Sequence, residues 1–338
     1  MADVDVAKPA ASELEVAFEQ LRPQLTGYCY RMLGSAFEAD DAVQETMLRA
    51  WRSFDRFEGR AALSSWLYRI ATNVCLTMLD GRSRRARPMD LGGPSAPEVA
   101  DASTLVTHGE EMWVEPIPTG RVVSGEGDPA ELAQARETLR LAFVAALQHL
   151  PPRQRAVLIL REVLRWQATE VAELLETSVA SVNSALQRAR ATLGAQDVSE
   201  GELSGDGMAA EDRELLGRYV EAFEDFDMDA LVTLLHEDAT MSMPPFELWL
   251  RGAGAIRAWN LGPGSGCRGS KLVPINGNGM PGFAQYRAGE DGAFHAWGVQ
   301  LMDVSDGRIA AINCFLDVER MFPMFGVPLS LPAGARVR

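Results

Sequence analysis

The stretch FEGRAALSSWLYRIATNVC, residues 57–75, decides the fold of the first part of the chain. Its apolar residues recur every three or four positions, which is the spacing of an α-helix with one buried face. The same spacing runs back to Leu14 and onward to Leu79, with a turn expected at Gly34. Residues 14–87 are therefore predicted to form an all-α module of several packed helices.

Helical spacing returns in residues 136–195, where Pro151-Pro152 should end one helix and start another because proline lacks an amide hydrogen. Two shorter helices, 166–176 and 179–193, are expected on either side of a break at Thr177-Ser178, which is a helix-turn-helix layout. An ordinary helical hairpin with a polar outer face would show the same pattern. The outward side chains of the last helix suit base edges and phosphates, and they are Ser181, Asn183, Ser184, Gln187 and Arg188.

Proline, glycine and acidic residues dominate residues 88–135, and such a composition cannot fill a core. We interpret this segment as a long acidic linker. Its one apolar island is MWVEPIP, residues 112–118, and a linker seldom keeps a tryptophan without a use. Trp113 is expected to dock on a neighbouring domain, with a loosely packed loop as the alternative.

Residues 209–326 change along their length from helical to strand-like spacing. Two helices are expected over 211–226 and 228–235, before the strands begin. The strand-like runs are 239–243, 282–287, 294–304 and 308–315. Asp306-Gly307 predicts a tight hairpin because glycine readily takes the positive φ that such a turn needs. The chain is thus predicted to be multidomain, with two all-α domains and one α+β domain.

The net charge of −15 is unevenly distributed along the chain. Residues 14–87 hold eleven basic and nine acidic side chains, and residues 136–193 hold eight and five, so both helical modules are mildly basic. Residues 88–135 hold one basic and nine acidic side chains, and residues 194–338 hold eleven and twenty-one. Separate electrostatic tasks would produce this segregation, whereas a single acidic enzyme domain would give no reason for it.

The cysteines and the start of the chain indicate the cellular compartment. Cys29, Cys75, Cys267 and Cys314 lie far apart and form no metal-ligand or paired-thiol spacing, so buried reduced thiols and no metal are expected. Residues 1–12 lack the basic flank and apolar run of a secretory signal, and no later stretch is long enough to cross a bilayer. We expect a cytoplasmic protein with no membrane contact.

The acidic stretch EADDAVQE, residues 38–45, comes shortly before the WLYRIATN helix. Taken alone, such a helix face is most simply solvated, with the apolar residues of its helix turned inward. Those inward residues are expected to be Ala42, Val43, Met47, Leu48 and Trp51. Residues 21–87 nevertheless resemble region 2 of the extracytoplasmic-function sigma factors of bacterial RNA polymerase, which carry both motifs in this order. The resemblance implies that the acidic helix docks on the clamp coiled coil of the polymerase β′ subunit, through Asp41, Gln44, Glu45 and Arg49.

The same resemblance implies that the loop before the tryptophan helix and Asn73 capture a flipped base of the minus-ten promoter element. An asparagine amide donates and accepts hydrogen bonds at once, and arginines beyond it suit phosphates. Trp66 and Tyr68 are expected to pack in the core instead of stacking on bases. The implied minus-ten residues are Arg60, Ala61, Leu63, Ser64, Asn73, Arg82, Arg84 and Arg85.

The second module also carries family motifs. LPPRQR, residues 150–155, with the helix VNSALQRAR, residues 182–190, resembles sigma region 4, which binds the β flap tip and reads the minus-thirty-five element. Where many relatives have Arg-Ser-Arg, this chain has Asn183-Ser184-Ala185, so two guanidinium groups are missing and phosphate anchoring should be weaker. Core RNA polymerase and promoter DNA are the partners that this resemblance implies, with no cofactor.

The linker and tail resemble parts of the same kind of protein. Trp113 with Pro116 is similar to a Trp-x-x-Pro motif between the sigma domains of subgroups with a C-terminal extension, where it would dock or thread toward the RNA exit path. Residues 209–326 are similar to the SnoaL-like polyketide cyclases, a cone of curved sheet with helices over it and a pocket inside. The candidate pocket residues are Trp249, His295, Trp297 and Asp317.

Some SnoaL-like proteins are enzymes, but the spacing here fixes no second catalytic partner for His295. A small-molecule sensor or a docking domain is therefore expected in the tail. We interpret the chain as an alternative sigma factor, not an enzyme, whose C-terminal domain regulates it. The alternative is a SnoaL-like cyclase or hydrolase with a DNA-binding appendage.

Overall fold

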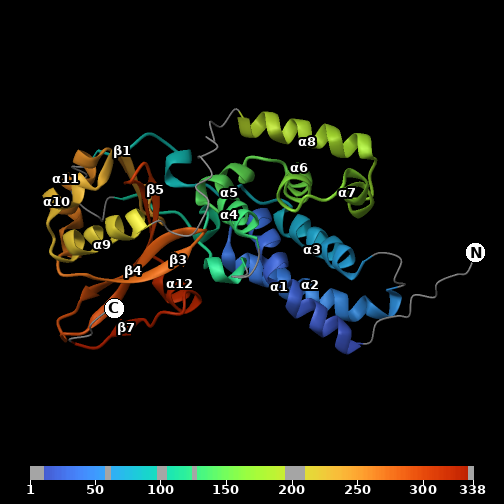
Figure 1. Cartoon of the computed structure of the whole chain (residues 1–338), viewed down its shortest axis with the longest axis horizontal. Helices are drawn as coiled ribbons and strands as arrows, with labels where there is room; N and C mark the ends of the chain where they lie inside the picture. Colours follow the sequence, from blue (N-terminus) through green and yellow to red (C-terminus); the bar gives the residue numbers. More distant parts are fainter. Residues whose placement is uncertain (1–10, 58–61, 97–104, 124–127, 195–209, 334–338) are drawn as a thin grey trace, which may run out of the picture. The chain divides into compact units, whose positions relative to one another are not determined.

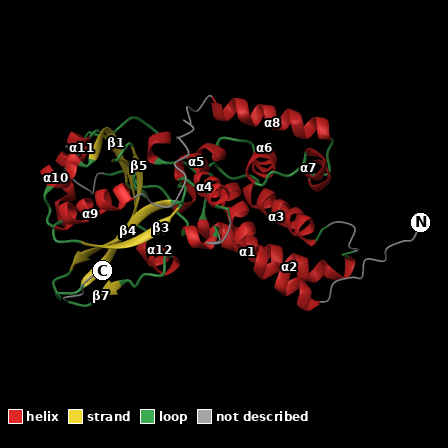
Figure 2. Cartoon of the chain, viewed as in Figure 1, coloured by secondary structure: helices red, strands yellow, loops and turns green. Residues whose placement is uncertain are grey.

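The computed structural model describes residues 11–57, 62–96, 105–123, 128–194 and 210–333. It divides into two compact units, the first made of residues 1–85 and 120–203 and the second of residues 86–119 and 204–338. Each unit is considered by itself. The regular elements described in the first unit are all helices, and the strands lie in the second (Figures 1 and 2). No helix in the described part of the chain has both the length and the apolar character needed to span a membrane.

The first unit contains two groups of helices joined in one core, as predicted for all-α modules. The first group is α1 (Ala11–Leu33), α2 (Ala36–Ser53), the short helix η1 (Phe54–Arg56) and α3 (Leu63–Leu79). The second group is α4 (Pro129–Glu137), α5 (Leu141–Gln148), α6 (Pro152–Leu158), the π-helical turn η6 (Ile159–Val163), α7 (Ala168–Leu174) and α8 (Val179–Gly194). The short helix η5 (Thr119–Arg121) begins at the last residue that the division assigns to the second unit and ends in the first.

The turn between α1 and α2 follows from two residues. Gly34 takes a φ of 74°, a left-handed conformation that favours glycine, and a Cβ there would meet the side chains of Gln148 and Arg85 at 3.1–3.2 Å. Ser35 is extended, and its Oγ accepts a hydrogen bond from the Glu38 amide at 3.2 Å, which caps α2. The start of α2 is therefore fixed locally.

A buried arginine joins the two helix groups of the first unit. Arg155, in the LPPRQR motif, is 3% exposed. Its guanidinium donates to the carbonyl of Met32 at the end of α1, to Gln148 Oε1 at 2.6 Å, and to the carbonyls of Gln148 and Leu150 at 3.1 Å. Burial lowers the pKa of Arg155 to about 10. Proline at 151 and 152 thus begins α6 in a way that aims this side chain into the core.

The second unit is an α+β domain. Its helices are α9 (Ala210–Glu224), α10 (Met228–Thr233), α11 (Ala253–Leu261), α12 (Val318–Met324) and the short helices η2 (Pro88–Asp90), η4 (Glu110–Met112) and η7 (Pro263–Cys267). Its strands are β1 (Leu235–Ser242), β2 (Trp249–Arg251), β3 (Lys271–Gly277), β4 (Met280–Ala288), β5 (Phe294–Ser305), β6 (Arg308–Phe315) and β7 (Ser330–Leu331). One hydrophobic core unites α9, α10 and α11 with the sheet.

The sheet has the order β2-β1-β6-β5-β4-β3, with β7 pairing with β5. Strands β1 and β6 run parallel, and the other neighbours run antiparallel. The predicted hairpin at Asp306-Gly307 is confirmed, because both residues have positive φ (52° and 68°) between β5 and β6. Asn278-Gly279 makes the equivalent turn between β3 and β4, with φ of 53° and 71°.

The segment expected to be one acidic linker is divided between the units. Residues 86–119 belong with the α+β domain, and α4 already begins at Pro129. Val114 and Ile117 are buried beside Trp113, so the expectation that residues 88–135 fill no core is wrong for this part. The expectation failed because composition averages over the segment, whereas WVEPI is a local apolar run.

Replacing Arg155 tests the joint between the helix groups. Arg155→Met removes a guanidinium that satisfies four buried acceptors, so we expect the free energy of unfolding of the helical unit to fall by about 2–4 kcal/mol. Urea unfolding followed by far-ultraviolet circular dichroism measures this. Arg153→Met, an exposed position in the same motif, is the matched control and should leave the midpoint within error. Equal midpoints for the two variants would contradict the role of Arg155.

Candidate functional site

The exposed face of α2 combines charged and apolar side chains. Asp41 and Gln44 are exposed on it, and Leu48 and Trp51 are each 50% exposed. The prediction that Leu48 and Trp51 point inward is therefore wrong. Residues 41, 44, 48 and 51 follow the three- and four-residue spacing of one helix face, whereas alanines and Val43 form the buried face. The sequence already contained the information for this arrangement, because the alanines and Val43 alone can form the buried face of α2.

Glu45 and Arg49 lie beside this face as an ion pair one turn apart. Arg49 Nε donates to Glu45 Oε1 at 2.6 Å, and both side chains are more than a third exposed. An exposed pair of this kind adds little stability, but it orients both side chains along the helix. The α2 face, which we define as Asp41, Gln44, Glu45, Leu48, Arg49 and Trp51, is thus an apolar patch within a polar surround.

The α3 helix separates buried from exposed residues as its sequence predicted. Tyr68 is 3% exposed, and Trp66 packs 5.0 Å from Phe57 between ring centroids. Asn73 is exposed, and Leu63 and Ser64 at the helix start are half-buried. Arg60 and Ala61 lie outside the described residues. Asn73 therefore exposes both a donor and an acceptor to solvent, on the same helix that begins with Leu63 and Ser64.

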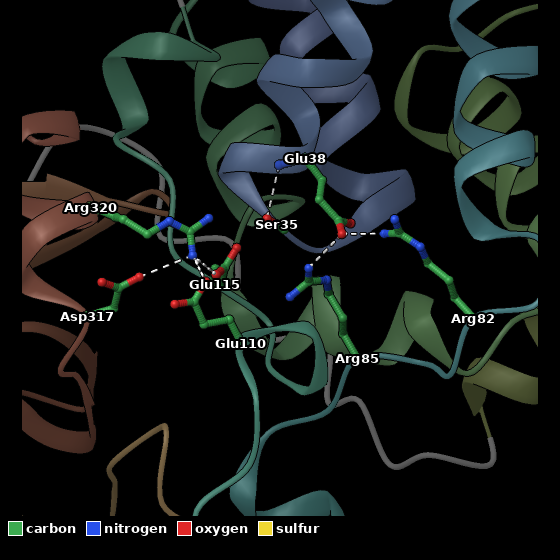
Figure 3. Close-up of polar contacts among 8 residues, drawn as sticks. All are labelled: Ser35, Glu38, Arg82, Arg85, Glu110, Glu115, Asp317 and Arg320. Carbon is green, nitrogen blue, oxygen red and sulfur yellow. Dashed lines mark hydrogen bonds and ion pairs between the residues drawn. The ribbon is translucent and has the colours of Figure 1, made fainter.

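The arginines after α3 divide into two kinds. Arg84 is exposed and contacts His149, and Arg82 is exposed while pairing with Glu38 Oε1. Arg85 is 7% exposed, and its Nη2 lies 3.0 Å from the same Glu38 oxygen (Figure 3). The assignment of Arg85 to phosphate contact needs correction, because its charge is neutralised inside the unit. Glu38, in the third position of α2, was missed, although Ser35 three residues earlier marks a capped helix start.

A cleft of about 260 Å³ lies between α3 and the second helix group of the same unit. Trp66 and Arg69 line it from α3, and Trp166 and Glu173 line it from the α7 region. Tyr68 contacts Trp166 edge-to-face at 5.2 Å, and Arg69 Nη2 lies 3.9 Å from Glu173 Oε1. The two groups thus pack against each other beside the start of α3.

The α8 helix exposes the residues expected to face DNA. Ser181, Asn183, Ser184, Gln187 and Arg188 are all exposed, while Val182, Leu186 and Ala189 are buried against the rest of the helix group. Ser178 Oγ accepts a hydrogen bond from the Ser181 amide at 3.1 Å, which fixes the start of α8. These five residues thus comprise one cation and four small or amide side chains, and Arg190 is also exposed on α8, where it pairs with Glu162.

The α+β domain encloses a cavity of about 30 Å³. This volume holds about two water molecules, whereas ligand pockets have about 300–1,000 Å³. Across it, Tyr219 OH donates to Gln300 Oε1 at 2.9 Å, Gln300 Nε2 to Gln285 Oε1 at 2.7 Å, and Gln285 Nε2 to Ser270 Oγ at 3.0 Å. The polar groups of the interior thus satisfy one another in a neutral chain.

Two titratable groups at the cavity have raised pKa values. Burial raises the pKa of Cys314 to about 12 and that of Tyr219 well above its usual value. Among the described residues that line the cavity there is no carboxylate and no imidazole. The described part of the chain also contains no group of three or more His, Cys, Asp or Glu side chains suited to a metal ion.

Only one of the four candidate pocket residues lines this cavity. Trp297 lines it, with the Arg287 guanidinium 3.1 Å from its ring centroid. His295 is exposed and bonds to Asp291. The pairing of β5 with β4 shifts register between Ala296 and Gly298, so Trp297 does not follow the alternation from His295. Trp249 Nε1 instead donates to the carbonyl of Gly92 at 3.0 Å, and Asp317 pairs with Arg320. The assignments of Trp249, His295 and Asp317 to the pocket are corrected accordingly.

Trp113 is 3% exposed within the second unit. Its ring meets His108 at 5.6 Å between centroids, and Ala86 lies opposite it in a parallel β-bridge. It contacts neighbouring residues of its own segment, and that segment packs with the α+β domain.

Comparison with known proteins gives matches over most of the chain. Family models for Sigma-70 region 2, Sigma-70, region 4 and the SnoaL-like domain match residues 17–85, 140–193 and 216–312. The chain is 43% identical over 320 residues to the ECF RNA polymerase sigma factor SigG of Mycobacterium tuberculosis, covering 93% of this chain and 83% of that one. It is 30% identical to SigJ of the same organism over 312 residues, 87% of this chain and 89% of that one.

One solved structure has a similar fold over nearly the whole chain. The crystal structure of the M. tuberculosis extracytoplasmic function sigma factor SigJ matches with a TM-score of 0.57 at 24% identity. The match covers 93% of this chain and 99% of that chain. The arrangement of helical modules followed by an α+β domain is thus shared with a protein of known structure.

Removing the Glu38 carboxylate tests whether Arg85 is structural. Glu38→Gln leaves the nearly buried Arg85 guanidinium without its anion, so we expect the free energy of unfolding of the helical unit to fall by about 1–3 kcal/mol. Urea denaturation followed by circular dichroism measures it. Glu19→Gln, which breaks an exposed pair with Arg22 on α1, is the control and should not move the midpoint. A Glu38→Gln protein as stable as that control would mean that Arg85 needs no anion.

Proposed function

The chain belongs to the extracytoplasmic-function sigma factors, promoter-recognising alternative sigma factors, and from this premise we propose which of its surfaces meet polymerase and DNA. The α2 face is the surface that docks on core RNA polymerase, at the clamp coiled coil of the β′ subunit. The second helix group is the part that meets the β flap. Both partners are proteins of the transcription machinery, and the C-terminal domain acts on the sigma part.

The single observation that supports the polymerase surface is the exposure of Leu48 and Trp51 on α2. Half-exposed large apolar side chains surrounded by charges are typical of a protein interface, in which tryptophan contributes much of the binding energy. Asp41, Gln44 and Glu45 on the same face supply complementary charge for steering and register. A solvated helix face needs no such anchors.

The promoter surfaces are assigned in two places. Asn73, with Leu63 and Ser64 at the start of α3, is proposed to hold an unstacked minus-ten base, and Arg82 and Arg84 the neighbouring phosphates. The face of α8 is proposed to enter the major groove of the minus-thirty-five element. Arg188 is its one cation among the five proposed contacts, so readout there depends mainly on neutral side chains.

The α+β domain is proposed to regulate without catalysis. Acid–base chemistry needs a group that titrates near the working pH, and the cavity offers a neutral amide chain with a tyrosine and a cysteine of raised pKa. A SnoaL-like hydrolase with a DNA-binding appendage is the competing hypothesis. It predicts turnover that depends on a residue of the cavity, whereas regulation predicts an effect on transcription.

Run-off transcription with purified core polymerase tests the polymerase surface. Leu48→Ala and Trp51→Ala are expected to weaken core binding by about 30-fold each, since buried interface anchors contribute about 2 kcal/mol or more. Transcript yield at limiting protein should fall with affinity. Val16→Ala removes an apolar side chain of 58% exposure from α1 and is the control, expected to bind as the unchanged protein does. Wild-type affinity in both α2 variants would overturn the proposed surface.

Changing Asn73 separates promoter opening from core binding. Asn73→Ala removes one donor and one acceptor, so open-complex formation should fall by about 5- to 100-fold while the affinity for core polymerase stays the same. Permanganate footprinting of the melted bases measures opening. Thr77→Ala, an exposed polar position one turn later on α3, is the matched control. Undiminished melting by the Asn73 variant would exclude this residue from base capture.

A further inference from the structure

The two helices that are proposed to read the promoter are joined through α7. The Tyr68 ring of α3 meets Trp166, just before α7, edge-to-face at 5.2 Å between ring centroids. Arg69 of α3 donates from Nη2 to the Glu173 carbonyl of α7 at 3.4 Å. We call these four residues the α3–α7 contact. Because α7 also packs on α8, it lies between the two reading helices (Figure 1).

A second set of contacts joins the same two groups of helices. The Arg155 guanidinium donates to the Met32 carbonyl, and Gln148 Nε2 donates to the Arg31 carbonyl at 3.4 Å. In each of these contacts, as in the α3–α7 contact, one residue lies in the segment that matches Sigma-70 region 2 and the other in the segment that matches region 4. Regions 2 and 4 are therefore held together in one closed body.

The closed body limits the distance between the two reading surfaces. Asn73 lies about 6 Å along α3 from Arg69, whose side chain and hydrogen bond reach the Glu173 backbone across about 11 Å. The turn from Glu173 to Ser181 is closed by a hydrogen bond at each end and spans at most about 19 Å. The proposed contacts on α8 extend about 10 Å further, to Arg188. With the reading side chains included, these steps reach at most about 55 Å when laid end to end.

The promoter elements are farther apart than this. Their names place them about 25 base pairs apart, which is about 85 Å along straight DNA. If each surface meets the inner end of its element, so that about six base pairs are saved, about 65 Å still remains. The duplex has a persistence length of about 150 base pairs, so a stretch of this length stays nearly straight. The closed body can therefore read one element at a time.

We propose that the α3–α7 contact is autoinhibitory. In the free protein it holds regions 2 and 4 too close together to read both promoter elements, and docking on core polymerase opens it. This inference rests on the proposed function, because it assumes that α3 and α8 read separate elements. It goes beyond that function by naming the contact that must break before transcription begins.

The α3–α7 contact is suited to opening. Arg69 Nη2 lies 3.9 Å from Glu173 Oε1, and the two side chains are 37% and 72% exposed, so this pair adds little stability. The cleft of about 260 Å³ leaves the facing surfaces incompletely packed. A partner opens such a contact only if it binds the open form more tightly than the closed one. Core polymerase meets this condition when it binds the α2 face and the second helix group at separate places.

The closed contact also places negative charge beside the start of α3. Glu170 and Glu173 line the cleft from α7, and Ser65 and Arg69 line it from α3. The minus-ten strand is proposed to approach the same end of α3, and carboxylates repel its phosphates. The closed form therefore opposes capture of this strand as well as the reading of two elements at once.

Cross-linking the contact tests whether it must open. In a Cys267→Ser chain, whose other native cysteines are buried, Arg69→Cys and Glu173→Cys are joined by a short bifunctional maleimide. We expect run-off transcription to fall at least about tenfold relative to the same variant capped with N-ethylmaleimide, because the joined chain stays closed. Glu19→Cys with Arg22→Cys, an exposed pair within α1, is the matched control. Its joined and capped forms should transcribe equally.

A distance measurement tests the opening without altering the contact. Thr77→Cys and Ala191→Cys place dyes at exposed positions on α3 and α8 of the Cys267→Ser chain. Energy transfer between the dyes is compared in the free full-length protein and in a complex with core polymerase and promoter DNA that yields transcript. We expect the transfer efficiency to fall at least about twofold in the complex.

The outcomes separate the two proposals. Equal transcription by the joined and capped forms of the Arg69→Cys, Glu173→Cys chain overturns the autoinhibitory contact and leaves the sigma function intact. Unchanged energy transfer in a transcribing complex overturns it too. If the capped chain itself fails to transcribe, the dye-labelled chain decides, because its α3–α7 contact is intact. Absence of core binding and of transcript with the unaltered protein overturns the proposed function, and the autoinhibitory contact with it.

Discussion

A guanidinium that is removed from water must find an acceptor for nearly every N–H group, and Arg155 meets this constraint with backbone and amide oxygens. Those oxygens belong to the end of α1 and to the turn between α5 and α6. The positions of both helix groups in the first unit are therefore tied to one side chain. A shift of these helices would leave the buried charge of Arg155 without its acceptors. The exposed faces of α2, α3 and α8 therefore keep fixed positions relative to this core.

Much of the architecture could be read from the sequence, since helical spacing and the Asp306-Gly307 turn are local signals. Strand β3 is not among the expected strands, and a proline such as Pro274 within a run is a sequence signal against a strand. It is tolerated here since β3 is the last strand of the sheet, where one amide has no partner to meet. The inward assignment of Leu48 and Trp51 failed for a different reason. Large apolar side chains are buried on average, but those of a protein interface are exposed in the free protein.

The functional residues divide in the same way. Exposure of Asn73 and of the polar face of α8 follows from helical periodicity alone. The burial of Arg85 depends on its ion pair with Glu38. The two residues are far apart in sequence, so no local pattern predicts this contact. The candidate pocket residues were chosen by side-chain type, whereas the direction of each side chain on its strand depends on register. His295 and Trp297 show this, since they lie two residues apart yet only Trp297 meets the cavity.

In most linkers the number of residues sets the distance that the linker can span. The bridge between Ala86 and Trp113 makes these two quantities independent of each other. A chain segment inside a closed loop can lengthen or shorten without changing the distance between the points that the loop joins. Doubling such a loop costs only about 0.6 kcal/mol of closure entropy. A change in the number of residues inside this loop would therefore leave the distance between its ends the same, whereas a change between Val114 and Thr119 would not.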